Sequence, residues 1–287
     1  MKLLSCGLIV AAIFLFPGDI RAEQNLAKAD AAQPQAIPFH LKDGFQIEVE
    51  GGIGPLEGLK FILDTGTTTS VIDSRIADRL SAVRHPGTAF NFDSLVSVDW
   101  VEFRDLHFGP IEVRNVSMMV TELAKSSDLI GKADAIIGLD VLNRVGKLRI
   151  CYDSGMILLT PGDANAQGGS EGEQSGYITV QAMVQGHPVR LLLDTGMDGV
   201  VLYEDRIQKR VPKLWLVREK RGHKGRLQGK NAWLLFRLDG RELDTEVFLL
   251  NGPREDLLPG IDGYLGARSL KAKTVEIDFA GKTTRWH

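Results

Sequence analysis

The stretch Phe61–Ile72 reads FILDTGTTTSVI and drives a carboxylate, Asp64, onto the end of three apolar residues. The apolar run predicts a buried strand, and the Thr65–Gly66 pair that follows predicts a tight turn. A charge in an apolar setting costs several kcal/mol unless it is paired or hydrogen-bonded. One such Asp has no clear meaning alone, so the rest of the chain has to show whether it recurs.

The same motif occurs a second time, 130 residues further along the chain. Val189–Leu202 reads VRLLLDTGMDGVVL and places Asp194, Thr195 and Gly196 directly after another apolar run. At average residue usage, two DTG triplets in a chain of this length are an event on the order of 10⁻³. The repeat therefore indicates a duplicated functional element rather than two unrelated turns.

The surroundings of each motif repeat as well. FQIEVE and LKFIL precede Asp64, YITVQAMV and VRLLL precede Asp194, and each pair predicts a β-hairpin whose second strand carries the Asp at its end. Downstream, AIIGLDVL contains Gly138 and GYLGARSL contains Gly266, 74 and 72 residues after the respective Asp. A short helical turn and a closing hairpin are expected after each Gly. Landmarks at a nearly fixed offset indicate an internal duplication.

The duplication predicts the domain organisation. Residues 161–175 are rich in Gly, Ser, Gln and Ala without periodicity, as is typical of a flexible linker. We therefore expect an N-terminal lobe over residues 37–160 and a C-terminal lobe over residues 176–287. Residues 23–36 resemble a disordered lead-in.

The N-terminus is typical of an export signal, which we expect to span residues 1–22. Lys2 supplies the positive start, Leu3–Phe16 the apolar core, and Ala22 the small residue at the cleavage site. Fourteen residues are too few to span a bilayer comfortably, so no stable membrane anchor is expected. The sequence thus predicts an exported protein, periplasmic or secreted.

Composition and charge exclude several classes of function. The net charge of −3 gives no drive toward nucleic acid. Cys151 would be the only Cys after the signal, and the six His are scattered, so neither a disulfide nor a metal or other cofactor is expected. One local exception is the segment 206–230, with ten Lys and Arg against the single acid Glu219. This segment is either a solvated hairpin surface or a binding edge for acidic ligands.

Two β-rich lobes that each present an Asp on a tight turn suggest a pseudo-two-fold arrangement in which the two turns meet. Two carboxylates brought that close cannot both ionise, and they share a proton. One of them can then deprotonate a water molecule while the other protonates a carbonyl, which is general acid–base hydrolysis without a covalent intermediate.

The two motif pairs, FILDTGTTTSVI with AIIGLDVL and LLLDTGMDGVVL with GYLGARSL, resemble the signatures of retropepsin-like aspartic proteases, in which such proton sharing is known. The resemblance covers roughly residues 38–161 and 176–287. Among these proteases, the chain is similar to an exported bacterial family in which two such lobes are fused. It implies an all-β fold of two retropepsin-like β-barrel lobes related by a pseudo-two-fold axis, with short helices after each Gly of the second motif. It also implies that Asp64 and Asp194 are the catalytic pair.

The resemblance implies supporting roles for the residues after each Asp. Thr65 and Thr195 would reach across to the backbone of the opposite lobe, and Gly66 and Gly196 would let each turn approach the water. The segments 136–138 and 264–266 would form the strands that cross beneath the turns.

Thr67 fits the family pattern at the position after DTG, whereas Met197 departs from it. A hydroxyl on Thr67 can donate to ionised Asp64, and Met197 offers no such donor to Asp194. We therefore expect the resting proton on Asp194, with Asp64 as the better base.

The sequence as a whole predicts an aspartic endopeptidase that acts on extended polypeptides as a monomer, with flaps around residues 88–101 and 222–231. An alternative is a catalytically silent protein that binds a peptide or partner in the same cleft. Met197 and the absence of a Tyr at the position of a pepsin flap Tyr favour that alternative. A purely structural β-rich envelope protein would leave the two DTG turns without a role.

Overall fold

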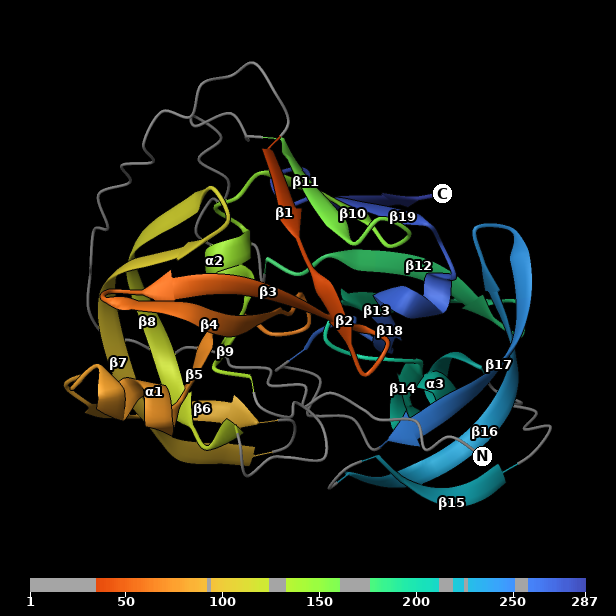
Figure 1. The fold of residues 1–287 in the computed structure, drawn as a ribbon. Helices are drawn as coiled ribbons and strands as arrows, with labels where there is room; N and C mark the ends of the chain where they lie inside the picture. The colour runs from red at the N-terminus through yellow and green to blue at the C-terminus, as the bar shows by residue number, and fades with distance from the viewer. Residues whose placement is uncertain are drawn as a thin grey trace.

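The computed structural model describes residues 35–91, 94–123, 133–160, 176–211, 219–224, 227–250 and 258–287. The predicted export signal (1–22), nearly all of the lead-in and the linker (161–175) lie outside the described residues. In the described part, no helix is long and apolar enough to cross a membrane. Regular structure there is mostly strand, which confirms the all-β prediction (Figure 1).

The first half of the chain builds an eight-stranded sheet that carries the first DTG motif. The predicted hairpin is β3 and β4, and β4 ends at Leu63, next to Asp64. The short strand β9 lies between β4 and β5, parallel to the former and antiparallel to the latter. The strands in sheet order are β2 (His40–Lys42), β3 (Gln46–Ile53), β4 (Leu56–Leu63), β9 (Ala135–Ile137), β5 (Val71–Asp73), β8 (Ile111–Thr121), β7 (Ser94–Phe108) and β6 (His85–Asn91).

The second half builds a seven-stranded sheet with the same order as the first sheet without β2. Its hairpin is β12 and β13, and β18 lies between β13 and β14 as β9 lies between β4 and β5. The match agrees with the internal duplication predicted from the sequence. The strands in sheet order are β12 (Thr179–Val184), β13 (His187–Asp194), β18 (Gly263–Gly266), β14 (Val200–Tyr203), β17 (Arg241–Leu250), β16 (Leu227–Leu238) and β15 (Glu219–Lys224).

A third, five-stranded sheet joins the halves. The closing hairpin of the first half pairs antiparallel with that of the second through β10 and β19. Strand β1 begins at Gln35, two residues before the predicted start of the N-terminal lobe at residue 37, because it pairs with β11 at the edge of this sheet. The strands in order are β1 (Gln35–Pro38), β11 (Met156–Thr160), β10 (Lys147–Cys151), β19 (Thr274–Asp278) and β20 (Thr283–Trp286).

Short helices follow the landmarks that repeat. Asp73 caps the first of them by accepting a hydrogen bond from the Arg75 N–H at 2.9 Å. The helical turns predicted after Gly138 and Gly266 are both present, the second as a 3₁₀ turn. The helices are α1 (Ser74–Arg79), α2 (Leu139–Leu142), α3 (Glu204–Arg210) and η2 (Ala267–Leu270).

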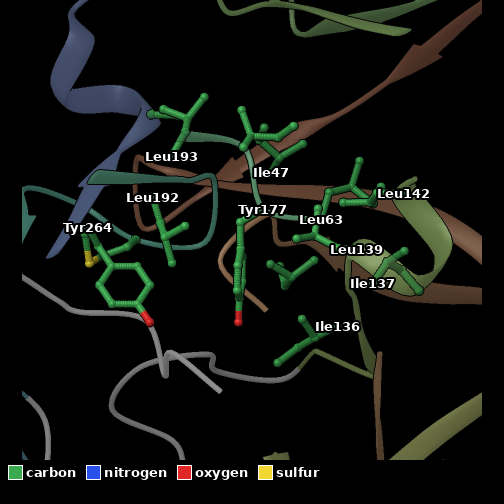
Figure 2. Packing of buried hydrophobic residues seen from close by; sticks show 14 of the residues in the cluster. Ile47, Leu63, Ile136, Ile137, Leu139, Leu142, Tyr177, Leu192, Leu193 and Tyr264 are labelled. Carbon is green, nitrogen blue, oxygen red and sulfur yellow. The ribbon is translucent and has the colours of Figure 1, made fainter. Parts of the chain in front are cut away.

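The core is one apolar cluster to which both halves contribute. Leu63 and Leu193, the residues that precede the two Asp, are buried in it, as Figure 2 shows together with their neighbours. The two DTG turns therefore rest on a packed apolar base.

The predicted flap regions fall on two hairpins, β6–β7 and β15–β16. The residues at their tips, 92–93 and 225–226, lie outside the described residues. A role of these hairpins as flaps stays a prediction.

Candidate active site

Strand pairing holds each Asp at the end of a buried strand. In the first half, the Asp64 N–H donates to the Ile137 carbonyl at 2.9 Å, directly after the parallel pairing of β4 and β9. In the second half, Asp194 is the last residue of β13 and pairs with Gly266 on β18. Only 5% of Asp64 and 1% of Asp194 is exposed. The parallel neighbour therefore fixes the backbone at both positions while burial strips water from both carboxyls.

Two Thr residues lock the turns to each other across the interface of the halves. The Thr65 hydroxyl donates to the Leu193 carbonyl, and the Thr195 hydroxyl donates to the Leu63 carbonyl, both at 2.7 Å. Each hydroxyl also accepts from the N–H of the other Thr at 3.1 Å. Four reciprocal hydrogen bonds thus join buried backbone of one half to buried side chains of the other.

The two Gly residues allow the turns to approach each other closely. A Cβ atom on Gly66 would lie 2.5 Å from Cγ of Asp194, and one on Gly196 would lie 2.7 Å from Cγ of Asp64. Real Cβ atoms essentially never come so near to another heavy atom. Any residue other than Gly would therefore push the opposite carboxyl out of place.

The two Asp side chains meet at the centre. The pKa of each carboxyl responds to the other, and each also accepts from the backbone two residues on: Asp64 from the Gly66 N–H at 2.8 Å and Asp194 from the Gly196 N–H at 2.7 Å. Two buried carboxyls that interact in this way do not both ionise, so they share a proton. We call Asp64 and Asp194 the dyad.

The environment raises the pKa of both carboxyls. Burial is the main cause for Asp64, whose pKa rises to about 6 although its hydrogen bonds oppose the rise. Burial and then the charge of Asp64 raise the pKa of Asp194 further above its usual range. The pair therefore holds a single proton around neutral pH, with Asp194 as the more strongly protonated member.

The cause expected for this asymmetry was wrong. The Thr67 hydroxyl donates to the Thr69 carbonyl at 3.1 Å and not to Asp64. The backbone N–H groups of Thr67 and Met197 each lower the pKa of the nearest Asp. Because every residue except Pro supplies that donor, Met197 is equivalent to Thr67 in this respect.

Two side chains beside the dyad were missed by the sequence analysis. Gln46 donates from Nε2 to the Gly196 carbonyl at 3.4 Å, and Tyr177 interacts with the Thr68 side chain and with the charge of Asp64. Gln46 is the first residue of β3 and Tyr177 lies two residues before β12, and both reach the site through cross-strand register. A signal was present in the repeat, since both lie at the start of the strand opposite an Asp.

Among the described residues, no group of three or more His, Cys, Asp and Glu side chains could hold a metal ion. In the basic segment 206–230, two described cations pair with acids: Arg210 with Asp262 at 2.6 Å and Lys230 with Glu204 at 2.8 Å. These two residues therefore form ion pairs within the chain. They do not support the hypothesis that the segment 206–230 is a binding edge for acidic ligands.

The raised pKa values predict how stability depends on pH. In the unfolded chain both carboxyls ionise near their ordinary value of 3.8, while in the folded protein they hold a proton to higher pH. Stability from the protonated dyad is therefore fully present below about pH 4 and is lost as pH rises through 6. A variant with Asn at both positions should gain in melting temperature over the wild type as pH rises from 4 to 8. A difference that is constant over this range would contradict the raised pKa values.

Residues 53–144 match the family model described as "gag-polyprotein putative aspartyl protease", and this range contains the first DTG turn. The solved structure of a retropepsin-like aspartic protease from Rickettsia conorii matches with 18% identity and a TM-score of 0.32, covering 44% of this chain and 89% of that one. No curated protein matches. The chain is thus similar to retropepsin-like aspartic proteases, with the second DTG turn lying beyond the residues that the family model matches.

Proposed function

We propose that this protein is an aspartic endopeptidase that hydrolyses extended polypeptides with Asp64 and Asp194 as its catalytic pair. The observation that carries the proposal is the buried dyad, in which one carboxyl from each half interacts with the other and both pKa values are raised. Burying two carboxyls raises the free energy of the folded state. A fold that keeps them together supports a chemical use for the shared proton.

The proposed reaction needs only water and the dyad. Ionised Asp64 takes a proton from a water molecule, whose oxygen attacks the peptide carbonyl carbon while protonated Asp194 donates its proton to the carbonyl oxygen. A hydroxyl group of the tetrahedral intermediate then returns a proton to Asp194. Asp64 donates the proton that it took from water to the leaving nitrogen. The C–N bond breaks, and both carboxyls regain their starting states.

The two sheets would act as lobes around one cleft, residues 37–160 on one side and 176–287 on the other. An extended substrate would bind between them by backbone hydrogen bonds, with side-chain pockets giving selectivity. Action outside the cytoplasm is part of the proposal and rests on the sequence of residues 1–22 alone.

The catalytically silent alternative loses one of the features that favoured it. Met197 is buried, and its backbone supplies the same donor to Asp194 that Thr67 supplies to Asp64. Digestion of a peptide library by the wild type and by the Asp64→Asn/Asp194→Asn double variant tests the proposal. We expect cleavage by the wild type, suppressed by a statine-containing peptide, and none by the double variant. A wild type that binds the statine peptide but cleaves nothing would favour the silent alternative.

The close approach of the turns gives a second test. Gly196→Ala should lower kcat/KM by about 10²-fold, because the new Cβ displaces the Asp64 carboxyl from the attacking geometry. Gly281→Ala is the matched control, since this exposed turn has no positive φ and a Cβ there would meet only the Asp278 side chain, at 3.2 Å or more. Equal activity of the two variants would mean that the carboxyl position does not limit turnover.

A further inference from the structure

Gln46 stands beside the first Asp by strand register. Ile47 pairs with Leu63 across the β3–β4 hairpin, and this register places Gln46 opposite Asp64. The side chain is buried, and its Nε2 donates to the carbonyl of Gly196 in the second half. The side-chain amide of Gln46, in the first half, therefore contacts the DTG turn of the second half.

Tyr177 holds the corresponding place in the second half. Thr179 pairs with Leu192 across the β12–β13 hairpin, and the register continued by two residues places Tyr177 opposite Asp194. Only 4% of Tyr177 is exposed, and its hydroxyl end interacts with Thr68 in the first half. Each half thus crosses to the other at the same position, one with an amide and the other with a phenol.

The Tyr177 hydroxyl is a donor close to the dyad. Burial raises its pKa to about 12, with the charge of Asp64 adding to the rise, so the phenol is neutral and keeps its proton around neutral pH. Within the described residues the hydroxyl makes no hydrogen bond of good geometry. The Tyr264 hydroxyl is in the same situation and points the same way in Figure 2, away from Ile47 and Leu193.

A buried donor without a well-placed acceptor is unfavourable, so an acceptor that arrives with a ligand would be favoured there. An extended polypeptide brings carbonyl oxygens to the dyad whatever its sequence. The register places Tyr177 opposite Asp194, and its hydroxyl end reaches Thr68 beside the other turn, so a peptide bound at the dyad passes near this hydroxyl. Gln46, the counterpart on the other side, presents different donors and acceptors.

We propose that the Tyr177 hydroxyl donates a hydrogen bond to a backbone carbonyl of the bound polypeptide on the Asp64 side of the dyad. This makes Tyr177 a substrate-positioning residue, and it makes the two sides of the cleft unequal, so that a peptide is favoured in one direction. The inference rests on the proposed peptidase function.

The test compares Tyr177→Phe, which removes only the hydroxyl, with the wild type. Two quantities are measured: the Kd of a statine-containing peptide by calorimetry, which needs no turnover, and kcat/KM for a peptide that the wild type cleaves. Both should worsen by about 5- to 10-fold in Tyr177→Phe, the worth of one hydrogen bond. Tyr152→Phe is the matched control, because it removes another buried hydroxyl without a well-placed partner, one that follows β10 and does not interact with Tyr177 or the dyad, and should leave both quantities unchanged.

Three outcomes would overturn the inference. If the wild type cleaves and binds while Tyr177→Phe equals it, the hydroxyl does not contact the ligand and the proposed function still stands. If Tyr177→Phe shifts the lower apparent pKa of kcat/KM without changing Kd, the phenol acts on Asp64 and not on the substrate. If the wild type neither cleaves peptides nor binds the statine peptide, the proposed function and this inference both fail.

Discussion

Asp64→Asn, Asp194→Asn and the double variant are all expected to lower kcat/KM by the same factor, about 10³-fold or more. The two carboxyls share one proton and act as a unit, so either amide removes both the base and the acid from the reaction. The measurement is steady-state hydrolysis of one peptide by the four proteins. Equal losses in the three variants would identify the dyad as a single catalytic unit.

Asp239→Asn is the matched control for this series. It makes the same chemical change at an exposed turn whose φ of 49° is well tolerated by Asn, and it should retain full activity. Losses that simply multiply in the double variant would mean that the two Asp act independently. Substantial turnover in either single variant would remove that Asp from the mechanism.

Thr65→Val and Thr195→Val are each expected to lower the free energy of unfolding by about 2–5 kcal/mol. Each Val keeps the shape of the side chain but leaves a buried carbonyl and a buried N–H of the opposite turn without their partner. The effects of the two changes should not add, because the four hydrogen bonds form one network. Urea denaturation of the two single variants and the double variant measures this.

Thr284→Val is the control for the Thr variants. Its hydroxyl makes one hydrogen bond, at 2.9 Å to the Glu276 carbonyl in a partly buried hairpin, and its loss should cost about 1 kcal/mol or less. If Thr65→Val costs no more than Thr284→Val, the hydrogen bonds across the interface do not hold the two turns together.

The local β-structure could be predicted from the sequence, whereas the joining of the halves could not. Alternation in FQIEVE and YITVQAMV predicted the hairpins β3–β4 and β12–β13, because the two faces of a strand differ in burial. The pairing of β10 with β19 links segments from different halves, and local periodicity carries no signal for such a partner. The boundary between lead-in and lobe was set two residues late for the same reason, since Gln35 and Ala36 are ordered by pairing with β11.

In the candidate site, too, the residues of the local motif could be predicted, whereas contacts that depend on the folded chain could not. The repeat of DTG pointed to Asp64 and Asp194 and to the Thr that follows each of them. The Thr67 hydroxyl was assigned to the wrong acceptor, because the conformation of the turn and not the residue type aims it at Thr69. Gln46 and Tyr177 lie at equivalent places in the repeat, but their closeness to the dyad follows from register and became evident with the strand pairing.

Titration of the active sites with a statine-containing peptide tests most directly that the two turns of one chain build one catalytic site. Increasing amounts of the peptide are added to a known concentration of the wild type, and the remaining hydrolysis is measured at several protein dilutions. We expect activity to fall linearly to zero at one inhibitor per chain, with a specific activity that does not change on dilution. An endpoint of one inhibitor per two chains, with activity lost on dilution, would contradict it, because each site would then need turns from two molecules.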